Sequence, residues 1–556
     1  MRFWLYWHTL RHLKRAQIVA RVTKRWKKLN LEAPAGQPIR AGRKSVGIDP
    51  WRESAFAESG RFTFLNETHR LSKDGGWNKP GVSKLWLYNL HYFDWINALP
   101  GRAETLSAPD STTYWIRRWI AENPAPNGNG WEPYPLSLRI VNWIKWLVRQ
   151  PATDTAALPE IFRSLELQAH VLSQRIETHL LGNHLFENAK ALVFAGCFFD
   201  GEAANAWFEL GARILHTELG EQVLADGAYF ELSPMYHSII LEDVLDLLSL
   251  QEAYPGKPWT GYGLERAHLE QNVTSMLGWL SKMTHPDGQI ALFNDAAMGI
   301  APNLAMLNRY AEQNGLRIPG PLRADGVQMM SAPGFIRVNR GPMSAILDVG
   351  KVGPDYVPGH GHADTLTFEC SLGDQRVLVN SGTSVYGESP ERLRQRGTAA
   401  HNTVVVDDKN SSEVWKGFRV ARRAYPRDVA IDVSGEPWMV SAAHDGYRRL
   451  PGQVIHRRRW EFGPHSLLVA DRLEGEHKSA HARFHFHPRI EVALCEPQAG
   501  SLRVNDRRTL SYIVSQGRAR LEDSTYHPEF GCSIPNKCLV VELEQGESVV
   551  AFDFSA

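Results

Sequence analysis

The sequence predicts a multidomain α+β protein, with a helical half followed by an antiparallel β-sandwich. The chain has 556 residues, more than one hydrophobic core supports, since single cores stop growing at roughly 250–300 residues. Apolar residues recur at helical spacing from about residue 51 to residue 316, and short β-branched and aromatic runs follow after about residue 331. We therefore expect an N-terminal basic helical extension over residues 1–45, a helical domain over 46–325 and a β-sandwich over 326–556.

The expected helices and strands are read from runs of apolar residues. In the first half, helices are expected over residues 95–99, 136–150, 161–181 and 237–254, where pairs joined by loops on one side would form a curved α/α array. In the second half, alternating runs bounded by turn residues predict strands. These runs lie at 334–340, 343–350, 366–382, 402–408, 466–473, 482–488, 539–544 and 549–555.

Composition narrows the classes of function. Lys and Arg number 62 against 61 Asp and Glu, a formal net charge of +1, so no global positive field favours nucleic acid as a partner. Hydrophobic content of 43% and charged content of 22% exclude wholesale disorder. The 18 Trp and 16 Tyr offer flat apolar faces with polar edges, which suit sugar rings as well as cores. Five cysteines without C-x-x-C spacing predict no disulfide framework.

The N-terminal segment combines aromatic residues with scattered bases. It lacks an apolar h-region with a cleavage site, and the chain lacks a run of about 18 apolar residues. We therefore expect a cytoplasmic location, with periplasmic export by an unrecognised route as the alternative. The bases suit an anionic membrane surface, but we favour a solvated helix with Trp4, Leu5 and Trp7 docked on the body of the protein. These bases are Arg11, Lys14, Arg15, Arg21, Lys24, Arg25, Lys27 and Lys28.

The densest polar cluster of the helical half is GNHLFEN, residues 182–188. Helical spacing places Asn183, His184 and Glu187 on one face. An amide, an imidazole and a protonated carboxyl can together grip a carboxylate. The alternative is a buried helix start capped by Asn183, with His184 satisfied internally.

Aromatic residues near loops supply further candidates. Tyr236 begins a helix in DGAYFELSPMYH, and a phenol beside hydrogen-bonding groups can carry protons; the alternative is simple packing. In GWEPYPLSLR, Trp131 and Tyr134 are expected on a loop, where they line sugar subsites or pack internally. Arg139 and Asn142, on the helix that follows, are expected to line the same subsites.

Two histidines alternate in GHGHAD before a strand of the second half. On an extended segment His360 and His362 share one side and can face a common cleft. A metal needs at least a third ligand, which His401 or Asn380 could supply. The alternative is a solvated loop without a metal.

Four motifs in this order, GNHLFENAKALVFAG, DGAYFELSPMYHS, GHGHADTLTFE and AHNTVVVD, resemble the heparinase II/III-like family of polysaccharide lyases. The resemblance implies an incomplete (α/α) toroid followed by an antiparallel β-sandwich. The flanks YWHTLRHLKRAQIVARV, LWLYNLHYFDWI, GWEPYPLSLRIVNWIKW and YHPEFG are similar to a branch found beside bacterial surface-polysaccharide synthesis genes, which implies an exopolysaccharide context.

The resemblance also implies a reaction, β-elimination at C4 of a uronic acid, which leaves a 4,5-unsaturated end. A base removes the C5 proton, an acid protonates the leaving oxygen, and the adjacent carboxylate must be neutralised. Carried over by motif, Asn183 with His184 and Glu187 neutralises the carboxylate. Tyr236 is the acid, and also the base when the C5 proton and leaving group lie on the same side. His360 is the base for the opposite epimer.

The same resemblance places a structural metal, zinc, at His362, while the chemistry itself requires no cofactor. Asn380 and His401 are the further candidate ligands, although relatives often carry Asp where this chain has Asn380, and a neutral amide is a poorer zinc ligand than a carboxylate. Tyr386 and Arg396 are expected to reach the cleft, with Tyr386 as the reserve candidate for the acid.

Two other classes of function remain open from the sequence. A glycoside hydrolase on a similar α/α scaffold needs two carboxylates flanking the bond, and Glu132, Glu187 and Asp295 are available. A non-catalytic polysaccharide-binding or assembly protein could keep the same fold. The expected partner is an acidic polysaccharide or oligosaccharide rather than nucleic acid, with peripheral membrane contact through the basic N-terminus.

Overall fold

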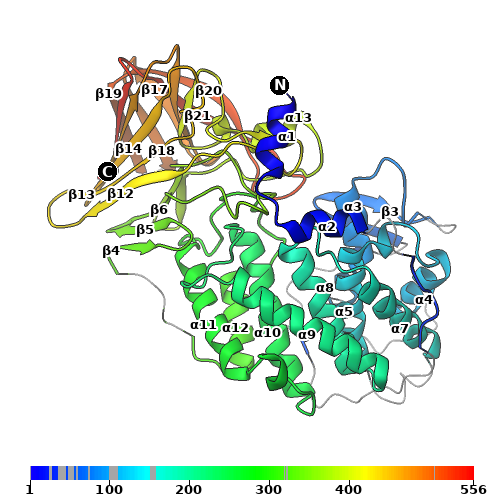
Figure 1. Ribbon diagram of the computed structural model, residues 1–556. Helices are drawn as coiled ribbons and strands as arrows, with labels where there is room; N and C mark the ends of the chain where they lie inside the picture. The colour runs from blue at the N-terminus through cyan, green and yellow to red at the C-terminus, as the bar shows by residue number, and fades with distance from the viewer. Residues whose placement is uncertain are drawn as a thin grey trace.

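The computed structural model describes residues 2–23, 28–34, 46–47, 55–57, 60–72, 76–98, 111–150, 158–318, 320, 324–505 and 508–555. Figure 1 shows a helical lobe and a β lobe, with the N-terminal helices lying along the side where the lobes meet. The predicted order of a helical half and an antiparallel β half is confirmed. Among the described residues, no helix is long and apolar enough to cross a membrane.

Several helices of the first lobe begin where the chain offers a cap or a proline. Ser83, Ser111, Ser233 and Asn303 each accept a backbone N–H of the first turn, which satisfies a donor that the helix leaves unpaired. The helices of this lobe are α3 (Lys84–Tyr92), α4 (Thr112–Glu122), α5 (Pro133–Arg149), α7 (Pro159–Gln174), α8 (Gly182–Phe198), α9 (Glu202–Gln222), α10 (Pro234–Ala253), α11 (Arg266–Lys282) and α12 (Leu304–Gln313).

A small antiparallel sheet also belongs to this part of the chain, which the sequence predicts as wholly helical. It comprises β1 (Phe56–Ala57), β2 (Arg61–Phe64) and β3 (Glu67–Arg70). In β2, Phe62 and Phe64 are buried while Arg61 and Thr63 are exposed, the period of two that a strand requires. The run is too short to stand out against the helical periodicity around it.

The β lobe contains three larger antiparallel sheets. The first has the order β4-β5-β6-β7-β8, the second β12-β13-β14-β15-β22-β19-β18-β17 and the third β20-β21-β16-β9. The first sheet and two short strands comprise β4 (Gly326–Met330), β5 (Phe335–Arg340), β6 (Met343–Asp348), β7 (Phe368–Leu372), β8 (Gln375–Leu378), β10 (Val414–Trp415) and β11 (Arg419–Val420). The others comprise β9 (Val404–Val406), β12 (Pro426–Asp432), β13 (Trp438–His444), β14 (Ile455–Gly463), β15 (Ser466–Glu474), β16 (Ala480–His485), β17 (Glu491–Glu496), β18 (Ala499–Asn505), β19 (Arg508–Gln516), β20 (Arg518–Tyr526), β21 (Ile534–Glu542) and β22 (Glu547–Asp553). A short helix, α13 (Pro390–Gln395), interrupts the strands.

Much of the tryptophan excess belongs to the core of the helical lobe. Trp119 packs edge-on against Trp143, with ring centroids 5.6 Å apart, and lies tilted against Trp131 at 5.7 Å. All three rings are at most 2% exposed. Such aromatic pairs add roughly 0.5–1.5 kcal/mol each beyond the area they bury. These rings therefore stabilise the lobe and do not present sugar platforms.

The N-terminal segment folds as two helices, α1 (Arg2–Leu10) and α2 (Arg15–Thr23). The prediction that Trp4 and Trp7 dock on the body is wrong, because both side chains are exposed. Tyr6 packs instead, with its ring 4.9 Å from that of Trp415. Of the predicted basic residues, Lys24, Arg25 and Lys27 lie outside the described residues.

Candidate active site

A cavity of about 1070 Å³ lies among the two lobes and the N-terminal helices. This volume lies just above the usual range of ligand sites, about 300–1,000 Å³. Its walls include side chains from α2, α8 and α10 and from the loops around residues 357–360, 384–388 and 416–419. Among the sequence-predicted site residues, the cavity is lined by Tyr134, Asn142, Asn183, His184, Glu187, Tyr236, His360 and Tyr386.

The start of α8 is held against a buried carboxyl group, that of Glu231. Gly182 has φ +58°, and a Cβ at this position would lie 2.2 Å from Glu231 Oε1. Only glycine tolerates both the left-handed backbone and this close approach. Glu231 Oε1 accepts the Tyr229 hydroxyl at 3.1 Å and the Asn183 backbone N–H at 3.4 Å. Asn183 therefore lines the cavity and does not cap the helix, whose N-cap is Leu181.

One helical turn of α8 presents an imidazole and a carboxyl group to the cavity. His184 Nδ1 lies 3.0 Å from Glu177 Oε2, and its ring lies 4.5 Å from that of Tyr134. Burial by itself would raise the pKa of Glu177, but the contact with His184 outweighs burial and lowers this pKa. Burial raises the pKa of Glu187, which favours its neutral carboxyl form. The structure thus places an imidazole and a carboxyl group inclined to hold its proton together beside the cavity.

Two tyrosine hydroxyls meet in the cavity beside His360. The hydroxyl oxygens of Tyr236 and Tyr386 lie 3.0 Å apart, and the Tyr236 ring lies 4.0 Å from the His360 ring. Tyr236 stands at the start of α10, whose N-cap Ser233 accepts the Tyr236 backbone N–H. Burial raises the pKa of both phenols above the ordinary value, so both hydroxyls keep their protons at neutral pH.

The buried carboxylate of Asp295 contacts His360, His362 and Arg392. Its carboxylate forms a two-point ion pair with Arg392, one contact being 2.6 Å, and lies 2.9 Å from His360 Nδ1 and 2.8 Å from His362 Nε2. Although burial opposes it, Arg392 with the two imidazoles holds the pKa of Asp295 well below its usual range. An ionised carboxylate can only accept, so the Nδ1–H of His360 donates to it. His360 Nε2 lies 3.3 Å from Glu231 Oε2.

Three predicted substrate-binding residues do not line the cavity. Trp131 is 2% exposed and lies in a short 3₁₀ turn, and its indole N–H donates to the Asn123 carbonyl. Arg139 is fully buried, with its guanidinium 3.8 Å from the centre of the Trp119 ring. Arg396 is fully buried and donates to the carbonyls of Gly361 and Gly417. Their predicted contact with substrate is therefore wrong.

Tyr134 and Asn142 do line the cavity, but from a different element than expected for Tyr134. Tyr134 lies in the first turn of α5, because Pro133 starts the helix directly after Glu132. Asn142 donates from its amide to the Tyr92 carbonyl at 3.0 Å. The breaker-rich run before the helix therefore ends earlier than the sequence pattern indicates.

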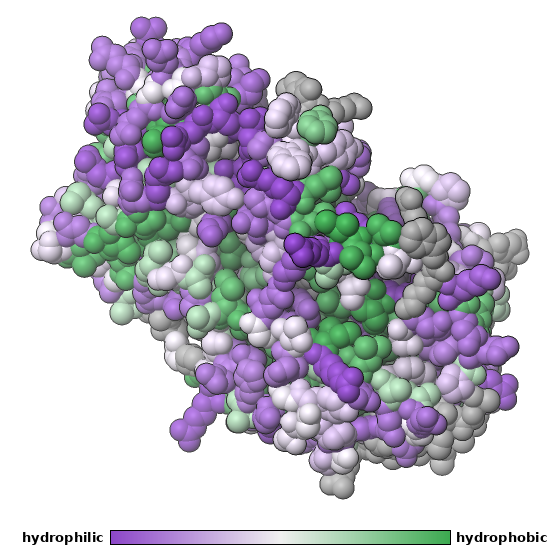
Figure 2. All heavy atoms as spheres, in the orientation of Figure 1, coloured by the Kyte–Doolittle hydropathy of each residue, from purple (hydrophilic) through white to green (hydrophobic). Residues whose placement is uncertain are grey.

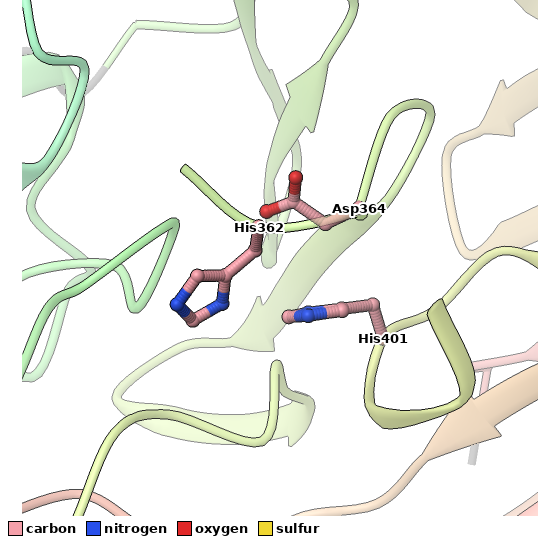
Figure 3. A group of neighbouring side chains, drawn as sticks. All are labelled: His362, Asp364 and His401. Carbon is pink, nitrogen blue, oxygen red and sulfur yellow. The ribbon is translucent and has the colours of Figure 1, made fainter. Parts of the chain in front are cut away.

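Three buried side chains beside His360 form a candidate metal site. The ligand atoms of His362, Asp364 and His401 lie within 4.8 Å of one another, and Figure 3 shows the two imidazoles close together with Asp364 beside them. Within the described chain, His362 Nδ1, Asp364 Oδ2 and His401 Nε2 are buried without a hydrogen-bond partner. Two imidazoles and a carboxylate are donors that zinc prefers, so the residues fit the implied metal.

Asn380, which the sequence predicts as a metal ligand, instead contacts Thr367 and His401. Its Oδ1 accepts the Thr367 hydroxyl at 2.8 Å and lies 3.3 Å from His401 Nδ1. Asn380 is therefore placed to orient His401, while Asp364 offers the candidate carboxylate ligand. A zinc ion at this place would tie the loop of His362 to the segment of His401. Because Asp295 takes Nε2 of His362, Nδ1 is left to face a metal.

We expect the protein to take up one equivalent of zinc after treatment with chelator. Zinc that binds only the folded chain raises its free energy of unfolding by about 2.7 kcal/mol at a hundredfold excess over Kd. The unfolding midpoint rises with it. His401→Ala should abolish both uptake and the shift, whereas Asn380→Ala should weaken them less. Metal analysis with thermal unfolding measures both. Equal loss in the two variants would restore Asn380 as a ligand.

Four important residues escaped the sequence reasoning as site residues. Glu231 lies inside the quoted motif DGAYFELSPMYHS and Asp364 inside GHGHADTLTFE, so both were within reach of the motif comparison. Asp295 was considered only as a hydrolytic carboxylate. Arg392 carries no local signal, since its partner Asp295 lies 97 residues away in the chain.

Comparisons with known proteins agree with this architecture. Residues 62–314 match the family model for the Heparinase II/III N-terminus, and residues 323–551 match that for Heparinase II/III-like, C-terminal. A heparin-sulfate lyase of Bacteroides stercoris is 26% identical over 335 residues, which cover 56% of this chain and 46% of that protein. One of Pedobacter heparinus is 26% identical over 363 residues, which cover 58% and 52%. The chain therefore spans about half the length of these relatives.

Solved structures share the fold. The crystal structure of heparinase III superposes with a TM-score of 0.72 at 18% identity, covering 88% of this chain and 81% of that one. A heparan sulfate lyase from Pedobacter heparinus gives a TM-score of 0.58 at 20% identity, covering 89% and 81%. The two family models together account for most of both lobes, and the chain belongs to the heparinase II/III-like family.

Proposed function

We propose that this protein is a polysaccharide lyase that cleaves a uronic-acid-containing acidic polysaccharide by β-elimination. The observation that carries the proposal is the set of groups that line one cavity: the hydroxyls of Tyr236 and Tyr386, the imidazole of His360 and the polar turn of α8. Membership of the family and the names of the two heparin-sulfate lyases support the same reaction class.

The polar turn of α8 neutralises the uronate carboxylate. An Asn183 amide and an imidazole N–H of His184 donate to it, and a protonated Glu187 shares its proton. Neutralising this group stabilises the enolate-like anion that forms when C5 loses its proton. Because burial favours the neutral form of Glu187, this stabilisation is in place before substrate binds.

Proton transfer falls to Tyr236 and His360. The lone pair of His360 Nε2, fixed by Asp295 on the other nitrogen, takes the C5 proton. The electron pair of the C5–H bond forms the C4–C5 double bond, and the C4–O4 bond breaks toward the leaving oxygen. Tyr236 gives its proton to that oxygen, and the raised pKa of the phenol keeps this proton available at neutral pH. For the epimer with both groups on one side, Tyr236 would perform both transfers from its phenolate form, taking the C5 proton and passing it to the leaving oxygen, a form that its raised pKa disfavours at neutral pH.

Cations at the cavity rim suit a polyanionic chain. Arg21 from α2, Lys416 and Arg419 line the cavity. The hydrolase alternative finds less support, because Asp295 is fully buried in its ion pair with Arg392, and Glu132 accepts the Tyr88 hydroxyl and pairs with Lys84 at 2.9 Å. These two carboxylates are engaged in other contacts, and neither lines the cavity.

Incubation with a panel of uronate polymers tests the proposal. A lyase yields ultraviolet absorbance from the 4,5-unsaturated end in step with new reducing ends. Reducing ends without that absorbance would establish hydrolysis instead. Binding without either product would establish a non-catalytic polysaccharide-binding protein.

We expect KM to rise with pH through the titration of Glu187. Its folded pKa is raised, so the protonated carboxyl that accepts a uronate carboxylate persists above the ordinary pKa and disappears as pH passes the raised value. The ionised form repels the substrate, which we expect to weaken binding by about tenfold. Glu187→Gln should remove this step from the pH profile of KM. The same step remaining in the glutamine variant would assign it to another group.

A further inference from the structure

The N-terminal helices expose an unusual concentration of apolar side chains. Phe3 is 72% exposed, Trp4 60% and Trp7 54%. Among the described residues, nine large hydrophobic side chains are exposed within the first 31 positions, against ten in the rest of the chain. The others are Tyr6, Leu10, Ile18, Val19, Val22 and Leu31. We call these nine residues the N-terminal apolar face. In Figure 2, pale and green atoms are visible at the surface where α1 and α2 lie in Figure 1.

The charge of this segment differs from that of the rest of the chain. The first 31 residues contain nine Lys and Arg and no Asp or Glu, in a protein whose formal net charge is +1. Arg11, Arg15, Arg21 and Lys28 are exposed, next to the N-terminal apolar face. Aromatic residues combined with bases and no acids are typical of segments that bind the headgroup region of anionic bilayers.

The segment is anchored to the protein by its other side. Trp415 donates its indole N–H to Thr9 Oγ1 at 3.1 Å, and Gln17 donates to the Tyr356 carbonyl at 3.2 Å. Lys14 pairs with Glu221. These contacts hold α1 on the β10–β11 hairpin, the turn before α2 against α9, and α2 against the loop that contains Tyr356. Apart from Tyr6, which also packs on Trp415, the N-terminal apolar face therefore stays exposed while these other contacts hold the segment on the protein.

We propose that the N-terminal apolar face docks on an anionic lipid bilayer, with Phe3, Trp4 and Trp7 inserted at the interface and Arg11 and Arg15 among the headgroups. A second copy of this chain is the weaker occupant. In a two-fold dimer the same segment of both copies would form the interface, and its Lys and Arg side chains would repel those of the other copy. The docking surface itself is independent of the proposed enzymatic function.

Docking also bears on the cavity. Leu13, Gln17 and Arg21 of the same segment line it, so a docked molecule holds its cavity near the bilayer. If the proposed lyase activity holds, polymer close to a membrane is the substrate within reach, and this consequence rests on that function. The lyase activity and the membrane docking can be refuted independently. Product absorbance is measured without vesicles, and vesicle binding is measured without substrate.

Co-sedimentation of the full chain with vesicles tests the docking. We expect binding to equal parts of phosphatidylcholine and phosphatidylglycerol, and much less to phosphatidylcholine alone. Trp4→Ala with Trp7→Ala, and separately Arg11→Glu with Arg15→Glu, should each weaken partitioning by about tenfold or more. Matched controls on the β lobe should bind as the parent protein does, because their side chains are also exposed but lie outside the segment. These controls are Leu494→Ala with Ile513→Ala and Arg472→Glu with Arg518→Glu.

A second measurement reports the lipid contact itself. Brominated lipids should quench part of the tryptophan fluorescence, and Trp4→Phe with Trp7→Phe should keep vesicle binding but lose that part. No sedimentation with anionic vesicles, or undiminished sedimentation of the alanine pair, would overturn the proposal. So would a concentration-dependent dimer that the alanine pair abolishes, since the face would then bind a second copy. Each variant should unfold at the same midpoint as the parent protein, which shows that a loss of vesicle binding does not come from unfolding.

Discussion

Tyr236→Phe is expected to reduce kcat on a uronate polymer by about 10²- to 10⁴-fold while leaving substrate binding within about threefold. The substitution removes one hydroxyl and keeps the ring that lies 4.0 Å from the His360 ring. The leaving oxygen then lacks its proton donor, whereas the groups on α8 that hold the carboxylate are untouched. Initial rates from product absorbance and a calorimetric titration of the variant separate the two effects.

Tyr386→Phe is the matched control for this prediction. Its hydroxyl lies 3.0 Å from that of Tyr236, and burial raises the pKa of both phenols, so pKa alone does not distinguish them. If Tyr386 only orients Tyr236, its removal should cost no more than about tenfold in kcat, with little change in KM. A near-normal rate in Tyr236→Phe beside an inactive Tyr386→Phe would move the acid to Tyr386.

The fold was largely accessible from the sequence because its signals are local. The run of residues 136–150 repeats its apolar positions at helical spacing and lies in α5 except for its last residue, and the run of residues 466–473 alternates and lies within β15. The small sheet β1-β2-β3 was missed because its strands hold at most four residues each. The exposure of Trp4 was also missed, since periodicity shows that a helix has an apolar face but not whether the protein covers it.

The site was accessible only where one motif carries the residue. Asn183, His184, Tyr236 and His360 all line the cavity, as the motifs predicted. Trp131 does not line it, because its ring is buried in the core. The loop-like sequence around it could not reveal that burial. Residues joined by long-range pairing lie beyond any local pattern. Arg392 is the example, since only the folded chain brings it to a carboxylate between two histidines.

Asp295→Asn is expected to destabilise the protein by about 3–5 kcal/mol, because it leaves the buried Arg392 guanidinium without its counter-charge. It also removes the acceptor that fixes His360 and His362. We therefore expect a further loss in kcat of about a hundredfold or more in the fraction that remains folded. Denaturant unfolding gives the first quantity, and rates corrected for the folded fraction give the second.

Asp471→Asn provides a control with nearly the same chemistry at a distance from the cavity. Asp471 is buried, accepts from Arg458 Nη2 at 2.8 Å and lies 2.6 Å from His456 Nε2, and none of these three residues lines the cavity. Its loss should cost a similar free energy of unfolding, since the same kind of buried pair is broken. The corrected kcat, however, should stay near that of the parent protein. Equal corrected rates in the two variants would show that Asp295 only stabilises the fold, and that His360 acts without its help.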